Sequence, residues 1–126
     1  MGKLLLVMLG GAFGTACRYG LSTFVYGHLE KPTFPWANLI INVSGSFVIG
    51  LLAQVFETRA LVSPAVRVAL LTGILGGYTT FSSFAYETFE LLRDGQRAFA
   101  VANAAGSVSL GLVAVWAGVR LAQILW

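Results

Sequence analysis

The nine residues Gly76–Phe84 combine glycines, hydroxyl groups and aromatic rings inside a long apolar segment. Their four Ser and Thr hydroxyls can donate hydrogen bonds to an anion. The edges of the Phe81 and Phe84 rings carry partial positive charge and can contact a small, desolvated anion, although core or lipid-facing phenylalanines are much commoner in membrane helices. Adjacent glycines weaken a helix, and a broken helix frees backbone carbonyls that can ligate a cation. The stretch therefore offers groups for ions of either sign.

Polar or small residues also recur every four positions in three other apolar segments. A spacing of four places such residues on one face of a helix. Polar groups are costly in hydrocarbon and therefore need a role there. Two roles fit these stripes, namely hydrogen bonding or close packing between helices and the lining of a polar pathway. The stripes are Gly10, Gly14 and Arg18; Asn38, Asn42 and Ser46; and Asn103, Ser107 and Gly111.

The composition is that of an integral membrane protein. Apolar residues make up 57% of the 126 residues and charged residues 10%, and the mean hydropathy is +0.81. Soluble domains carry about 25% charged and about 45–50% apolar residues. The single cysteine, Cys17, and the single histidine, His28, exclude an internal disulfide and a zinc site made from the side chains of one chain.

Four segments are long and apolar enough to cross a bilayer, which needs about 20 residues of helix. Charged or polar connections separate them, and we expect a single membrane domain over residues 1–126. The first segment superficially resembles a signal peptide, but Arg18 and the apolar stretch after it favour a span. The expected spans are about residues 4–26, 35–56, 64–92 and 98–121.

The third segment is too long for one straight helix. Its roughly 29 residues would extend over about 43 Å at about 1.5 Å per residue. We expect a break at Gly73, Gly76 and Gly77, which is tolerated only where protein or a water-filled cavity surrounds it. A second interpretation fits the spacing equally well, namely that these glycines only allow close helix packing.

The positive charges give almost no preference for one orientation in the membrane. Four Lys and Arg residues lie on the side of both expected termini and three on the other side, while Arg18 lies within a span. The positive-inside rule depends on this difference, and a difference of one is a weak signal. The chain can therefore insert both ways, and two opposed copies can pair about a twofold axis in the membrane plane.

Acidic side chains are nearly absent from the deep parts of the expected spans. Only Glu87 lies well inside one, whereas a cation transporter or proton-coupled exporter usually needs a deep carboxylate. Arg18 either draws anions toward an aqueous vestibule or has a structural role, at the lipid interface or paired with Glu87. A small multidrug transporter and a non-transporting subunit of a membrane assembly are the alternatives to an anion channel.

Enzymatic and nucleic-acid functions are disfavoured. Ser82 and Ser83 have no plausible triad, because His28 lies in a distant predicted loop. The glycines before Thr80 lack the lysine of a phosphate-binding loop. The sequence also holds no basic and aromatic array suited to nucleic acid.

Three stretches match one family pattern. They are Gly73–Phe84 (GILGGYTTFSSF), Gly10–Tyr19 (GGAFGTACRY) and Asn42–Gly50 (NVSGSFVIG). Together they resemble the small bacterial fluoride channels of the Fluc or CrcB family, and the pattern in the third segment is specific. The resemblance covers essentially the whole chain.

The resemblance implies an all-α membrane protein of four helices, the third one broken, which forms a dual-topology, antiparallel homodimer with two fluoride pathways. It implies a multi-pass channel, and no enzyme, in the cytoplasmic (inner) membrane of a bacterium, where passive fluoride export reduces toxicity. It also implies a structural sodium ion (Na+) at the dimer centre, held by the backbone carbonyls of Gly76 and Thr79. The residues that it places along the fluoride pathway are Asn42, Phe81, Phe84, Ser83, Ser107, Thr80, Asn38 and Asn103, with Arg18 and Glu87 in vestibule or structural roles.

Two positions differ from the commoner family pattern. Asn38 stands where threonine is frequent, and Asn103 stands where tyrosine is frequent. Both replacements keep a polar side chain. We therefore expect them to alter the details of the polar track and its rate, and not the activity.

Overall fold

The computed structural model describes residues 2–30, 32–59 and 62–126, and these form helices joined by short connections. The third of four helical passages, Pro64–Arg93, consists of four consecutive pieces. The expected all-helical protein with four long apolar helices is confirmed. In chain order the helices are α1 (Gly2–His28), α2 (Trp36–Thr58), α3 (Pro64–Val68), η1 (Ala69–Leu75), α4 (Gly76–Tyr78), α5 (Phe81–Arg93) and α6 (Arg97–Leu125).

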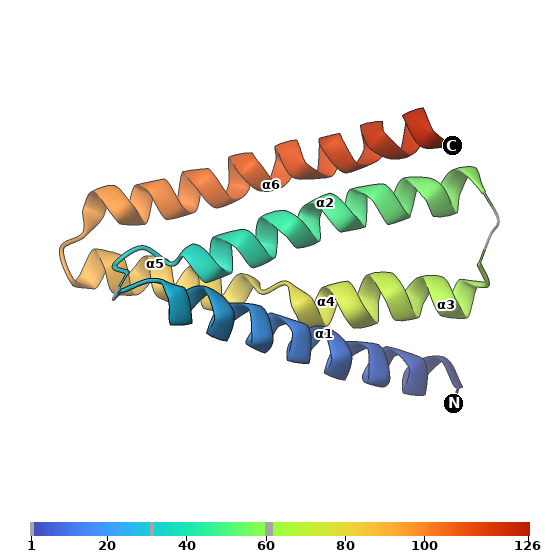
Figure 1. Cartoon of the computed structure of the whole chain (residues 1–126), viewed down its shortest axis with the longest axis horizontal. Coiled ribbons are helices and arrows are strands. Elements are labelled where there is room, and N and C mark those ends of the chain that lie inside the picture. The colour runs from blue at the N-terminus through green and yellow to red at the C-terminus, as the bar shows by residue number, and fades with distance from the viewer. Residues whose placement is uncertain (1, 31, 60–61) are drawn as a thin grey trace.

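The four passages run along the long axis of the molecule (Figure 1). α2 packs most extensively against α6, while α1 packs against η1 and α4. Each passage reverses the direction of the chain, so an even number of passages brings the two ends of the chain to the same end of the bundle, as Figure 1 shows.

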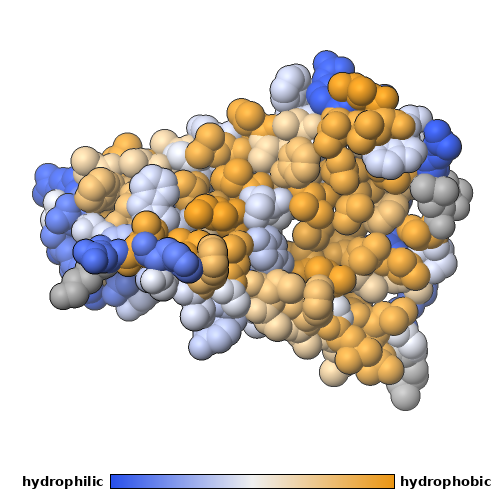
Figure 2. Space-filling model, viewed as in Figure 1, coloured by the Kyte–Doolittle hydropathy of each residue, from blue (hydrophilic) through white to orange (hydrophobic). Residues whose placement is uncertain are grey.

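The surface of the bundle is largely apolar. Figure 2 shows hydrophobic residues across the middle of the visible face and hydrophilic residues gathered toward its ends. Individual side chains such as Leu112 and Ile124 are 68% and 80% exposed. Exposure of apolar surface to water costs roughly 25 cal/mol per Å², so this surface is suited to lipid instead. The chain is therefore a multi-pass membrane protein.

Glycines allow α1 to approach the third passage closely. A Cβ atom added at Gly14 would overlap the carbonyl oxygen of Ile74, and one added at Gly10 would lie 2.8 Å from a backbone oxygen of η1. On the opposite side, a Cβ added at Gly73 would lie 2.9 Å from the carbonyl oxygen of Val7. Small residues at such positions let helix backbones touch, which is a main source of packing between membrane helices.

The contact between α2 and α6 has the same basis. A Cβ added at Gly50 would overlap the carbonyl oxygen of Val115, and one added at Gly118 would overlap that of Phe47. The two helices therefore meet backbone to backbone. This contact fixes the position of α2, which carries one wall of the site described below.

The third passage contains a segment of π-helix, which is wider than an α-helix, and then a break in the helix. η1 is a π-helix, and regular helix ends at Tyr78. Thr79 and Thr80 are extended, with φ and ψ of −82° and 158° and of −151° and 121°, respectively. α5 then begins at Phe81. The expectation that this passage is broken is confirmed.

The break lies after the three glycines, so its expected position at Gly73, Gly76 and Gly77 is wrong. Gly73 and Gly77 pack against α1 instead, and a Cβ added at Gly77 would lie 2.5 Å from the carbonyl oxygen of Gly11. Gly76, by contrast, has nothing within 4 Å of the position of an added Cβ. The physical reason for the shift is that the peptide groups of Thr80 find hydrogen-bond partners on α2, as shown below.

We expect Gly14→Ala to destabilise the fold by about 1–3 kcal/mol, because the added methyl group meets a backbone oxygen of η1 that cannot move alone. The measurement is the free energy of unfolding in detergent, from a denaturant titration followed by circular dichroism. Gly20→Ala is the matched control in the same helix, since nothing lies within 4 Å of its added Cβ. An equal decrease in the free energy of unfolding of the two variants would contradict the close approach of α1 and η1.

Candidate functional site

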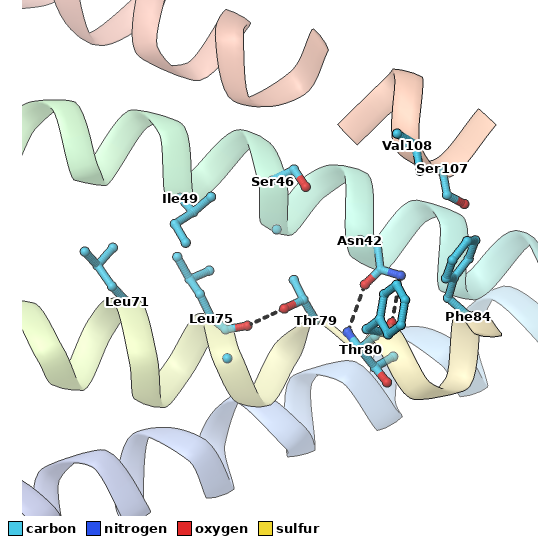
Figure 3. Close-up of a pocket in the computed structure, with 13 residues that line it drawn as sticks. Asn42, Ser46, Ile49, Leu71, Leu75, Thr79, Thr80, Phe84, Ser107 and Val108 are labelled. Carbon is cyan, nitrogen blue, oxygen red and sulfur yellow. Dashed lines mark hydrogen bonds between the residues drawn. The ribbon is translucent and has the colours of Figure 1, made fainter. Parts of the chain in front are cut away.

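The side chain of Asn42 in α2 binds both peptide groups of Thr80 in the break (Figure 3). Its Oδ1 accepts a hydrogen bond from the Thr80 amide at 2.9 Å. Its Nδ2 donates to the Thr80 carbonyl at 3.1 Å. Backbone groups at membrane depth find no water in hydrocarbon, so non-helical backbone needs such partners. Asn42 supplies them from a neighbouring helix.

Thr80 also begins the helix that follows. Its Oγ1 accepts a hydrogen bond from the Ser83 amide at 3.3 Å and donates one to the Ser83 hydroxyl at 3.1 Å. A threonine in this position is a favourable N-cap. Because helix resumes at once, Phe81 and Phe84 lie about one turn apart on α5, with ring centroids 5.6 Å apart and ring planes at 51°.

Four backbone carbonyls at the break, those of Gly76, Gly77, Tyr78 and Thr79, have lost the amides that a continuous α-helix would provide, because regular helix ends at Tyr78 and α5 begins at Phe81. In such a helix the amide of residue i donates to the carbonyl of residue i−4. The Thr80 amide would then bond to Gly76, but it bonds to Asn42. The Ser83 amide would bond to Thr79, but it bonds to the Thr80 hydroxyl. Carbonyls freed in this way can ligate a cation, and those of Gly76 and Thr79 are the two that the family resemblance predicts as ligands.

A cavity of about 370 Å³ adjoins the break, and we call it the first cavity (Figure 3). Side chains of α2, of both parts of the broken passage and of α6 line it. It brings together Gly76 and Thr79, whose carbonyls are the predicted cation ligands, and most of the predicted anion-binding groups. Seven of the residues expected from the sequence lie here, namely Asn42, Gly76, Thr79, Thr80, Phe81, Phe84 and Ser107.

A second cavity of about 280 Å³ is also lined by Thr80. Within it, the Asn38 Nδ2 donates a hydrogen bond to the Glu87 Oε2 at 2.7 Å. Arg18 lines the same cavity, but it forms no ion pair within the part of the chain that the structure describes. The expected residues gathered here are Arg18, Asn38, Thr80, Ser83 and Glu87.

A third cavity, of about 550 Å³, lies where α1 leads into α2 and where α5 turns into α6. It shares Tyr26 and Glu87 with the second cavity. The second cavity in turn shares Thr80 with the first. The three cavities therefore follow one another from the end of the bundle to the helix break.

Asn103 lines none of these three cavities. Its side chain is almost completely buried, at 1% exposure. Its Nδ2 donates to the Thr88 hydroxyl at 2.9 Å, and that hydroxyl donates to the Phe84 carbonyl at 2.8 Å. The Ser107 hydroxyl donates to the Asn103 Oδ1 at 3.4 Å. Asn103 thus links α6 to α5, and a place for it on an ion pathway stays a prediction.

Sequence reasoning missed a stripe of hydroxyl residues on α1 and a single threonine, Thr88, on α5. The stripe on α1 lines the second cavity, and its spacing of three or four residues would have revealed it. Thr88 had no such signal, because a threonine in a membrane helix commonly bonds only to its own backbone. The members of the α1 stripe are Thr15, Tyr19, Ser22 and Tyr26.

We expect Asn103→Ala to lower the free energy of unfolding by about 1 kcal/mol, the size of a typical side-chain hydrogen bond between membrane helices. The loss arises because α6 no longer holds the Thr88 hydroxyl. Ser107→Ala is the control, since it removes only the long hydrogen bond to Asn103. A denaturant titration that shows no greater loss for Asn103→Ala than for Ser107→Ala would refute this assignment.

Comparison with known proteins gives consistent matches along almost the whole chain. Residues 5–119 match the family model described as CrcB-like protein, camphor resistance (CrcB). The chain is 48% identical over 120 residues to the fluoride-specific ion channel FluC of Opitutus terrae, which covers 94% of this chain and 90% of that relative. Relatives of the same name from Rhizobium meliloti and Geobacter sulfurreducens are 42% and 44% identical over 125 residues, covering 99% of this chain and 99% and 100% of the relatives, respectively.

Proposed function

The chain belongs to the CrcB family, and from this premise we propose that it is a fluoride-selective ion channel of the bacterial cytoplasmic membrane. Its relatives carry the name fluoride-specific ion channel. The observation that carries the proposal is the helix break at Thr79 and Thr80, where Thr80 lines both the first and the second cavity and hydrogen-bond donors and phenyl rings gather. Fluoride would leave the cell passively along this route, which would reduce its toxicity.

The groups at the break suit a small, strongly hydrated anion, which must exchange water for other donors. The Asn42 amide carries two N–H bonds, and the Thr80 carbonyl uses only one of them, so the other can serve the ion. The edges of Phe81 and Phe84 add positive potential. No Lys or Arg of the described residues lines the first cavity. The ion would therefore be bound strongly enough to enter and weakly enough to leave.

We propose that the working unit is an antiparallel homodimer of dual topology. The nearly balanced positive charge supports insertion in both orientations. Phe81, which lines the first cavity, is 79% exposed in one chain, so a second copy would be needed to enclose the ion. The twofold symmetry of such a dimer would create two equivalent pathways.

We further propose that a structural sodium ion lies at the centre of this dimer. Within one chain, the carbonyls of Gly76 and Thr79 have lost their helical amide partners, as described above. Two oxygen ligands are few for a hard cation. The second copy would double them, so the ion would join the two chains and hold the two breaks against each other.

We expect purified protein in liposomes to release fluoride rapidly and chloride slowly. Replacing a phenyl ring by an aliphatic side chain removes the positive ring edge, so Phe81→Ile and Phe84→Ile should each reduce fluoride flux about tenfold or more, or roughly 1.4 kcal/mol on the barrier. Efflux is measured with a fluoride electrode. Phe89→Ile is the control, because Phe89 is 59% exposed on the same helix and lines none of the cavities.

Unchanged flux in both pore variants would contradict the place of these rings on the pathway. Equal release of chloride by the unmodified protein would contradict selectivity. Absence of any flux from a folded, dimeric preparation would refute the channel itself.

We expect about half of the chains to place their C-terminus on each side of the membrane, because the charge difference between the sides is small. A single reactive cysteine at Gln123→Cys, in a Cys17→Ser background, reports this in intact cells and in inverted vesicles treated with a membrane-impermeant maleimide. A protein of known fixed topology calibrates the labelling. Labelling from one side only would exclude dual topology.

A further inference from the structure

We propose that Asn42 is a positioning residue that keeps the carbonyl of Gly76 free for the central cation, in addition to any contact it makes with the anion. This inference rests on the proposed sodium site. One side chain of α2 would then have two tasks. The Asn42 amide lines the first cavity, where the anion is proposed to bind, and it also takes the Thr80 N–H that would otherwise bond to the Gly76 carbonyl.

The first step of the argument is a competition for one acceptor. In a continuous helix, the Thr80 amide would donate to the Gly76 carbonyl. The Asn42 Oδ1 takes this amide instead, at 2.9 Å. Because an amide has one hydrogen, the bond to Asn42 excludes a full bond to Gly76.

The second step concerns the conformation of Thr80. The Asn42 Nδ2 donates to the Thr80 carbonyl at 3.1 Å, so one side chain holds both peptide groups of this residue. The two bonds hold Thr80 extended, with φ −151° and ψ 121°. An extended residue directs its carbonyl away from the helix axis and interrupts the helical ladder.

The third step concerns what happens when the amide of Asn42 is absent. An unsatisfied peptide N–H at membrane depth is costly, so the Thr80 amide would seek another acceptor. The Gly76 carbonyl is the acceptor that the helical geometry favours. A Cβ added at Gly76 would meet nothing within 4 Å, and Gly76 lines the first cavity, so an ion in this cavity could reach it. Loss of Asn42 would therefore turn a cation ligand into a helical acceptor.

Two substitutions separate this positioning role from contact with the anion. Asn42→Ala removes both bonds to Thr80. Asn42→Asp keeps the oxygen that accepts from the Thr80 amide, but it loses the bond to the Thr80 carbonyl and brings a carboxylate that repels fluoride. The positioning role thus predicts that Asn42→Asp keeps its response to sodium and that Asn42→Ala needs far more sodium for the same response, whereas both lose fluoride flux. Asn38→Ala is the matched control, one turn away on the same helix, because Asn38 bonds to Glu87 and not to the break.

The test measures the thermal unfolding midpoint of the purified full-length protein in detergent, while sodium chloride replaces choline chloride at constant ionic strength. Sodium should raise the midpoint of the unmodified protein and of Asn38→Ala with similar half-saturation, and it should also raise the midpoint of Asn42→Asp. For Asn42→Ala, the half-saturating sodium concentration should rise about tenfold or more. Fluoride efflux is measured on the same preparations.

The outcomes divide clearly. An Asn42→Ala protein that keeps the sodium response but loses fluoride flux would overturn the inference and leave the proposed channel intact. If Asn42→Ala does not fold, a folded Asn42→Asp dimer without a sodium response would overturn it equally. No sodium response in the unmodified protein would remove the cation site and the inference together. A weakened sodium response in Asn42→Ala, with the response kept in Asn42→Asp, supports it even if the protein conducts no fluoride.

Discussion

The structure depends on one constraint, which is that hydrocarbon offers no hydrogen bonds to an interrupted backbone. A break in the third passage survives because a side chain from another helix replaces the lost helical partners. Asn42 does so with two bonds to Thr80, and the Thr80 hydroxyl then starts the next helix. The break is therefore stabilised by hydrogen bonds from a residue 38 positions away in the sequence.

This exchange of partners needs α2 and α1 to lie very close to the broken passage. Glycines provide that closeness, because their backbones touch neighbouring backbones where a methyl group would overlap them. Asparagines of two neighbouring helices then form hydrogen bonds with α5, the second half of the passage. Asn38 on α2 bonds to Glu87, and Asn103 on α6 bonds to Thr88. Close packing and a few directed hydrogen bonds together position α5 and its two phenyl rings.

The same arrangement accounts for a site that can serve ions of opposite charge. Carbonyls released by the break are acceptors and suit a cation, while amide, hydroxyl and ring-edge groups suit an anion. These groups meet in one cavity without Lys or Arg among its described lining residues. The second cavity, which Thr80 also lines, holds Arg18 and Glu87, so these fixed charges lie outside the first cavity.

Periodicity and composition determined the membrane class, the four helical passages and the polar stripes, because these follow from local hydropathy. The family followed from the resemblance of three short motifs to a known pattern. The excess length of the third segment also predicted a break. Only the tertiary structure decided where that break lies and which glycines pack, since Gly73 and Gly77 meet α1 while Gly76 faces a cavity. Likewise, spacing placed Asn42 on the right face, but its bonds to Thr80 arise from contact between distant segments, which no local pattern encodes.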